Sequence, residues 1–132
     1  MALKERIILD FSIGPVQGFI ARARRTRDFW AGSFLLSYLA GQAMAVVLEN
    51  GGTLILPAVA KSKDEISDPL LQAIVRLREK QPFDPRDENL RIATLPNRFR
   101  AEVPVDFFPN KCTEAINEAW NNLCQPVWER YL

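Results

Sequence analysis

The sequence predicts an α+β fold, and three observations support this prediction. The first residues alternate between apolar and polar, as in a β-strand with one buried face. A long apolar segment follows and ends at Asn50-Gly51-Gly52, which is typical of a buried helix with a C-terminal stop signal. Shorter segments of both kinds then alternate along the chain. The 132 residues suffice for one core, so we treat residues 1–132 as a single domain.

Residues 4–13 form the first predicted strand. Its two faces differ, one being wholly apolar (Ile7, Leu9, Phe11, Ile13) and the other mixed (Arg6, Ile8, Asp10, Ser12). Asp10 and Ser12 emerge together at the carboxyl end of this strand. Ligands usually sit at that end in open sheets, so these two side chains are candidates for a binding site.

A turn and a run of arginines follow the strand. Gly14 can adopt backbone angles that other residues avoid, and Pro15 suits the first position of a helix because its missing N–H would be unpaired there. The spacing of apolar residues over 16–23 predicts one or two helical turns with one apolar stripe. The arginines of the run are Arg22, Arg24, Arg25 and Arg27. Free backbone N–H groups, the positive end of a helix and nearby guanidiniums together favour an anion such as phosphate.

The helix predicted over residues 26–49 is apolar on nearly every side from 29 to 48. Such a helix is either buried all round or covered on its outer face by a second domain. Residues 53–59 form a second predicted strand, in which Pro57 marks an edge or a strand end.

The next elements are shorter. We predict a charged loop over residues 61–67. We expect Ser67-Asp68-Pro69 to cap a helix that runs to about residue 80. Residues 90–95 and 99–105 are two further runs with alternating apolar residues. They predict either a hairpin or one strand with a kink.

The last predicted helix begins at Pro109, and Pro126 breaks or kinks it before Trp128 and Tyr131. The order strand–helix–strand–(helix)–strand–helix is that of the beginning of a ferredoxin-like domain. A closing strand after the last helix is missing, so the chain either takes one from elsewhere or is the front piece of something longer. We therefore expect an incomplete sheet with a long buried helix.

Composition excludes several classes of protein. The net charge is +1, so any attraction to nucleic acid or to an anionic membrane must be local. No signal peptide opens the chain, and the longest apolar segment falls short of the ~20 residues of a membrane span. Cys112 and Cys124 would lie about 18 Å apart in one helix, too far to bridge, which favours a reduced, cytoplasmic protein. The absence of histidine excludes His-dependent hydrolysis and histidine-ligated zinc within this chain.

Asp10 with Ser12, next to Gly14, is the best candidate for chemistry. A carboxylate at a strand end beside a phosphate-accepting turn is how palm-type nucleotidyl enzymes hold a metal and a triphosphate. Metal catalysis on phosphates generally needs a second carboxylate, and nothing shows that Asp28 converges on the first. Alternatively, Asp10 is a sheet-end residue bonded to a helix N-terminus or to an arginine.

The arginine run also has two interpretations. It is either a solvated face or a phosphate-binding patch that Arg98 and Arg100 could extend. Nucleic-acid binding is the rival function, because phosphate contacts need little else. The predicted sheet lacks the exposed aromatic pairs on which RNA-recognition modules stack bases, which counts against it.

Several sequence blocks resemble one known family. They are Ser12-Ile13-Gly14-Pro15-Val16-Gln17, Phe19-Ile20, Ala23-Arg24, Thr26-Arg27-Asp28, Trp30-Ala31-Gly32-Ser33, Leu35-Leu36-Ser37 and Leu95-Pro96-Asn97-Arg98-Phe99. Together they resemble the N-terminal palm region of the large subunit of type III-B CRISPR effector complexes, over about residues 5–110.

The resemblance implies a role in antiviral defence. Full-length members of this family are similar to polymerases and nucleotide cyclases, with two palm domains that share an ATP site and make cyclic oligoadenylate. Their Gly-Gly-Asp-Asp motif lies in the second palm and their DNA-cutting His-Asp domain is separate, and this chain contains neither motif. The resemblance therefore implies that the chain is the first, non-catalytic, ferredoxin-like palm, an N-terminal fragment of a larger multidomain subunit.

The resemblance also implies where a nucleotide would bind. The positions carried over as pocket-lining are Asp10, Ser12, Gly14 and Gln17, with Arg24 and Arg27 as further nucleotide contacts, and no catalytic or metal-ligating residue is carried over. ATP and Mg²⁺ are expected only in the full subunit. The expected partners are other domains of the same subunit, other CRISPR effector subunits and, indirectly, guide or target RNA, with no membrane.

Two alternative functions remain open. The first is an RNA-contacting module that uses the basic run of residues 22–27. The second is an architectural module whose apolar helix (29–48), with Trp120, Trp128 and Tyr131, docks on other domains.

Overall fold

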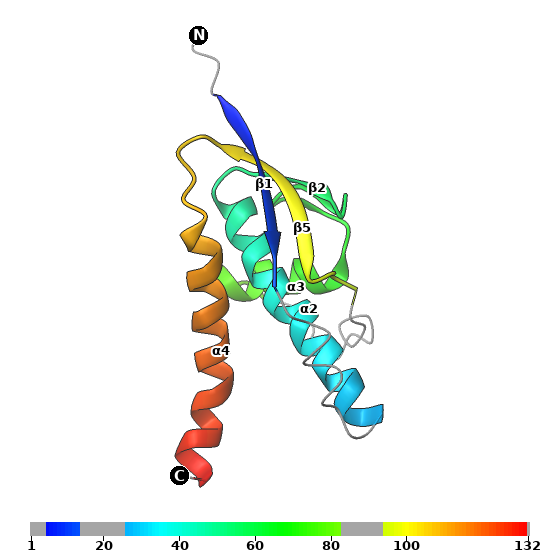
Figure 1. The fold of residues 1–132 in the computed structure, drawn as a ribbon, viewed down its shortest axis with the longest axis vertical. Helices are drawn as coiled ribbons and strands as arrows, with labels where there is room; N and C mark the ends of the chain where they lie inside the picture. The colour runs from blue at the N-terminus through cyan, green and yellow to red at the C-terminus, as the bar shows by residue number, and fades with distance from the viewer. Residues whose placement is uncertain (1–4, 14–25, 83–93, 132) are drawn as a thin grey trace.

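The computed structural model describes the backbone of residues 5–13, 26–82 and 94–131, and the side chains of 5–13, 34–82 and 94–122 (Figure 1). In chain order its elements are β1 (Arg6–Ser12), α2 (Thr26–Glu49), β2 (Thr53–Leu56), β3 (Ala60–Ser62), β4 (Glu65–Ile66), α3 (Pro69–Arg78), β5 (Arg98–Pro104) and α4 (Asn110–Tyr131). The predicted α+β class is confirmed. No helix in the described part of the chain is long and apolar enough to cross a membrane.

The main sheet has three strands in the order β1-β5-β2, and central β5 pairs antiparallel with both neighbours. Leu9 lies opposite Ala101, and Phe11 lies opposite Phe99 with ring centroids 5.4 Å apart. Residues directly opposite each other share a face, so the odd-numbered positions of β1 join the apolar face of β5. The alternation predicted for the first strand is confirmed.

In Figure 1, α2 lies behind the sheet and covers this apolar face, and α4 lies to the left, beside α2. Every residue of α2 from 39 to 48 is buried, including Gln42, which confirms the predicted all-round burial for this part of the helix. α2 contacts the sheet, α3 and α4. Its Gly41 lies so close to α3 that an added Cβ would stand 2.4 Å from the Ile74 Cδ1 atom. Burial of α2 therefore comes from its own chain.

Two details of the remaining elements bear on the sequence predictions. The Asp68 carboxylate caps α3 by accepting a 2.9 Å hydrogen bond from the Leu71 N–H, as expected. The predicted loop at 61–67 is wrong, because β3 and β4 form a small hairpin. Strands of three and two residues are too short for an alternating pattern to show them.

Two prolines have different effects on the second strand and on the last helix. β2 ends at Leu56, directly before Pro57, as the proline predicted. Pro126 does not break α4, which continues to Tyr131. A proline removes one main-chain donor, and the turns on either side can remain helical.

Of the run at 90–95, residues 90–93 lie outside the described residues.

No helix among the described residues covers the opposite face of the sheet (Figure 1). Its side chains alternate with the buried ones and include Asp10 and Ser12 of β1 and Arg98 and Arg100 of β5, all exposed. We call this the open face of the sheet.

Candidate functional site

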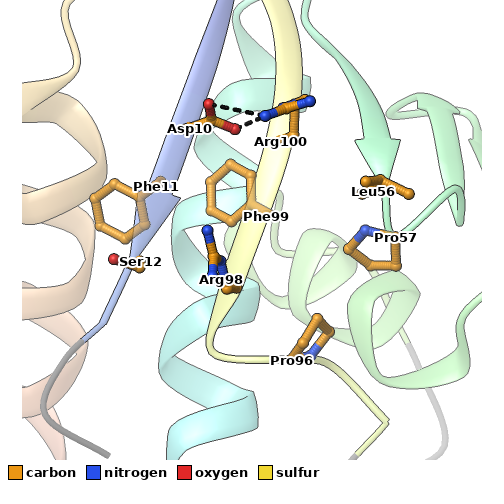
Figure 2. A pocket seen from close by; sticks show the side chains of 9 residues that line it. All are labelled: Asp10, Phe11, Ser12, Leu56, Pro57, Pro96, Arg98, Phe99 and Arg100. Carbon is orange, nitrogen blue, oxygen red and sulfur yellow. Dashed lines mark hydrogen bonds and ion pairs between the residues drawn. The ribbon is translucent and has the colours of Figure 1, made fainter.

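A hollow of about 490 Å³ lies on the open face, at the carboxyl end of β1 (Figure 2). Three segments form it, and it is lined by Asp10, Phe11, Ser12, Leu56, Pro57, Pro96, Arg98, Phe99 and Arg100. Its size falls within the range of ~300–1,000 Å³ that is usual for ligand pockets. The place matches the sequence prediction that this strand end is a candidate site.

The register between β1 and β5 builds the polar side of the hollow. It places Asp10 opposite Arg100 and Ser12 opposite Arg98. The Asp10 carboxylate accepts two hydrogen bonds from the Arg100 guanidinium, one of 2.7 Å from Nε and one of 3.3 Å from Nη2. This two-point geometry fixes the plane of the guanidinium as well as its position.

The ion pair changes the protonation equilibria of both partners. Hydrogen bonding to Arg100, together with the positive charges of Arg100 and Arg98, holds the pKa of Asp10 below its ordinary value. The same hydrogen bonds raise the pKa of Arg100. Asp10 therefore remains a carboxylate at neutral pH, and that carboxylate is already engaged by a cation.

Arg98 differs from Arg100 in having no such partner. It is exposed, and it makes no ion pair or side-chain hydrogen bond with any residue that the structure describes. The Ser12 hydroxyl opposite is likewise exposed. A guanidinium beside a free hydroxyl can bind an anionic oxygen without first giving up another bond.

The other wall of the hollow is apolar. It consists of Leu56, whose side chain is 59% exposed, with Pro57 and Pro96. A β-bulge between Leu54 and Leu56 shifts the register of β2, so that Leu56 lies opposite Arg100. The bulge thus places Leu56 on the open face. A cation facing an apolar wall suits a ligand with both an anionic group and a flat apolar part.

The structure tests only part of the predicted site. Asp10 and Ser12 line the hollow together. Gly14, Gln17 and Arg24 lie outside the described residues, and only the backbone of Arg27, in α2, is described. Whether these four residues reach the hollow stays a prediction.

Seven further lining residues were missed or given little weight by the sequence prediction. Arg98 and Arg100 were named only as an extension of the arginine patch, and five others were not considered as site residues: Phe11, Leu56, Pro57, Pro96 and Phe99. Alternation along residues 99–105 could have placed Arg98 on the same side as Arg100. The bulge that turns Leu56 outward leaves no signal in the sequence.

The described residues do not form a metal site by themselves. No group of three or more His, Cys, Asp or Glu side chains that could hold an ion is found among them. Asp10 is the carboxylate that lines the hollow, and it already forms an ion pair with Arg100. A Mg²⁺ ion here would need its ligands from elsewhere, so we derive no step through a metal.

Comparisons with known proteins agree with the resemblance seen in the sequence. The family model described as the N-terminal part of the CRISPR-associated protein Cmr2 matches residues 8–125. The chain is similar to the CRISPR system Cmr subunit Cmr2 of Pyrococcus furiosus, with 40% identity over 52 residues. That alignment covers 39% of this chain and 6% of the relative, so the chain spans a small part of that protein's length. No solved structure gives a significant match.

Proposed function

The chain belongs to the family of the N-terminal region of Cmr2, a subunit of type III CRISPR effectors, and from this premise we propose that it lines one half of an ATP pocket. In this proposal it is a non-catalytic palm domain in a cytoplasmic antiviral complex. The catalytic residues and the other half of the pocket come from further domains of the same subunit. The nucleotide is the substrate for cyclic oligoadenylate synthesis.

The topology of the sheet supports the palm assignment. Its order β1-β5-β2, with both pairs antiparallel, is that of the first three strands of a ferredoxin-like domain. The connection from β1 to β2 skips β5 and runs through α2, which packs on one face of the sheet. Among the described residues no helix covers the other face, which a ligand or a neighbouring domain could therefore approach.

The observation that carries the ATP proposal is the Arg98 guanidinium, which lies beside Ser12 and has no ion-pair partner among the described residues. It faces the wall of Leu56, Pro57 and Pro96. In this arrangement Arg98 attracts a phosphate oxygen and the Ser12 hydroxyl donates a hydrogen bond to it. The apolar wall offers a surface for the base. Asp10 does not touch the nucleotide here but holds Arg100 in place through their two hydrogen bonds.

Cyclic oligoadenylate synthesis by the full subunit tests this function. We expect Arg98→Ala to raise the KM for ATP about tenfold, because a charge-assisted hydrogen bond contributes roughly 1.5–3 kcal/mol. Ser12→Ala should have a smaller effect in the same direction. Arg76→Ala is the matched control, since Arg76 is an exposed arginine on α3. Equal KM values for Arg98→Ala and Arg76→Ala would contradict the proposal.

The alternative role as an RNA contact through residues 22–27 depends on residues outside those the structure describes, and it stays a prediction. RNA binding that falls steeply with salt, and falls further when Arg24, Arg25 and Arg27 are changed to alanine, would support it. Contacts with other effector subunits are likewise proposals.

A further inference from the structure

We propose that Asn97 is a positioning residue for the nucleotide site. Its side chain fixes the spacing between the two polar groups of the hollow, Ser12 on β1 and Arg98 on β5. Asn97 is not itself among the lining residues, and it acts through its neighbours in the chain. This inference rests on the proposed function and deepens it, because it concerns how the same site is held in shape.

The β1–β5 ladder ends in an unusual pair. Ser12 lies opposite Arg98, and the same register places Ile13 opposite Asn97. The Ile13 N–H donates to the main-chain carbonyl of Asn97 at 2.8 Å, as in a regular antiparallel pair. The Ile13 carbonyl accepts a 2.9 Å hydrogen bond from the side-chain amide of Asn97, and the described residues supply no main-chain donor to it. The Asn97 side chain therefore replaces a main-chain donor where the two strands end.

This pair lies directly beside the site. Ile13 follows Ser12 on one side, and Asn97 precedes Arg98 on the other, so each polar group is one residue away from the two bonds. Asn97 is half-buried, which limits competition from water. Strand ends fray when their last hydrogen bonds are lost. The Asn97 amide therefore keeps Ser12 and Arg98 at the spacing at which both can contact one anionic group.

A second anchor holds the other end of the segment formed by residues 95–97. The Leu95 N–H donates a 2.8 Å hydrogen bond to the hydroxyl of Ser37 in α2, and Ser37 is only 1% exposed. The Leu95 side chain is buried against the same helix, where a Cβ added to Gly41 would stand 2.9 Å from its Cδ1 atom. Pro96 lies between the two anchored residues, and its ring restricts φ. The segment is therefore tied to the core at one end and to β1 at the other.

Asn50 provides a matched control for the loss of such a hydrogen bond. Its side-chain amide donates to the Val46 carbonyl at 2.8 Å, and Asn50 is half-buried like Asn97. Asn50 also accepts a 3.0 Å bond from Lys111, so its removal costs one bond more. It lies at the end of α2 and does not line the hollow. A purely structural role predicts the same behaviour for both asparagines.

The first experiment measures cyclic oligoadenylate synthesis by the full subunit. We expect Asn97→Ala to raise the KM for ATP about threefold to fivefold, as the loss of one neutral hydrogen bond would. The kcat at saturating ATP should stay unchanged, because the segment holds a binding group and no reacting group. Asn50→Ala should keep the KM of the unmodified subunit, although thermal unfolding should fall by a similar ~2–5 °C for both variants.

A double variant tests whether Asn97 acts through Arg98. Once the guanidinium is gone, its spacing from Ser12 no longer matters. Asn97→Ala combined with Arg98→Ala should therefore have nearly the KM of Arg98→Ala alone, since residues that act as one unit are not additive. Fold-changes that multiply in full would show that Asn97 acts independently of Arg98 and would overturn the proposal.

Amide hydrogen exchange of the 132-residue chain tests the tie without nucleotide. The Ile13 amide should exchange about fivefold faster in Asn97→Ala and at an unchanged rate in Asn50→Ala. Equal Ile13 exchange in the two variants would show that the side chain does not hold the strand end, which overturns the proposal.

The outcomes separate this inference from the proposed function. If Arg98→Ala raises the KM for ATP but Asn97→Ala behaves like Asn50→Ala, the positioning role is wrong and the proposed function stands. If Arg98→Ala leaves the KM unchanged, the proposed function fails, and the role of Asn97 in nucleotide binding fails with it.

Discussion

The two faces of β5 present opposite environments on one strand. Phe99, Ala101 and Val103 face the helices with 4%, 0% and 1% of their surface exposed, whereas Arg98 and Arg100, which alternate with them along the strand, are exposed on the open face. The buried side chains contribute to folding through the removal of apolar surface from water. The exposed arginines contribute little to folding. Arg98 is available for a ligand, whereas Arg100 is held by Asp10. Substitutions on the helix-covered face should therefore lower stability, and substitutions on the open face should change ligand binding.

The largest expected effect is on the buried side. Met44 of α2 is completely buried in the core, so Met44→Ala should lower the free energy of unfolding by about 2–5 kcal/mol. Arg98→Ala on the open face should change it by no more than ~0.5 kcal/mol. Urea unfolding followed by circular dichroism measures both values. Similar losses for the two variants would remove the distinction between the faces.

Asp10→Asn tests the open face through a gain of binding. Because Asp10 holds Arg100 in two hydrogen bonds, its neutralisation should free a second guanidinium beside Arg98. We expect the affinity for ATP without metal to rise roughly threefold to tenfold, by calorimetric titration. A lower affinity that depends on Mg²⁺ would instead identify Asp10 as a metal ligand.

The pH dependence of stability should give the smallest effect. The folded-state pKa of Asp10 is depressed, so its contribution is complete above the ordinary pKa of an aspartate and is lost as the pH falls through the folded-state value. The carboxylate is exposed, and the contribution is therefore small. Asp10→Asn should slightly flatten the acid side of the stability profile. A variant that becomes more sensitive to acid would contradict this assignment of the ion pair.

The buried thiol of Cys112 gives a probe of the helix-covered side. Burial raises the pKa of this thiol to about 11. Its sulfur lies 3.8 Å from the Ala43 carbonyl oxygen of α2. It should react with thiol reagents only as fast as the protein unfolds, because a protonated, covered thiol is a poor nucleophile. Measured in a Cys124→Ser background, rapid reaction in the native state would show that this side opens readily.

Much of the fold could be predicted because its signals are local. Period-two alternation identified β1 and β5, unbroken apolar composition identified the burial of α2, and Asp68 before Pro69 identified the start of α3. The β3–β4 hairpin was missed because two very short strands carry no periodicity. The break predicted at Pro126 is wrong, since α4 runs through it.

The site was predicted only in part, because it depends on contacts between distant segments. Asp10 and Ser12 were found from their place at a strand end. Their pairing with Arg100 and Arg98 follows from the β1–β5 register, which joins residues about 90 positions apart and is not visible in either segment alone. The contribution of Leu56 depends on a bulge in β2.

The most direct test of the open-face account is a titration of the isotope-labelled chain with ATP, followed by NMR. Binding should be weak, because one half of the proposed pocket is missing, and the shifted amides should cluster at Ser12, Leu56, Arg98 and Arg100. Arg98→Ala should abolish these shifts and leave the spectrum of the buried face unchanged. Shifts that gather away from the hollow, or that persist unchanged in Arg98→Ala, would contradict the central claim.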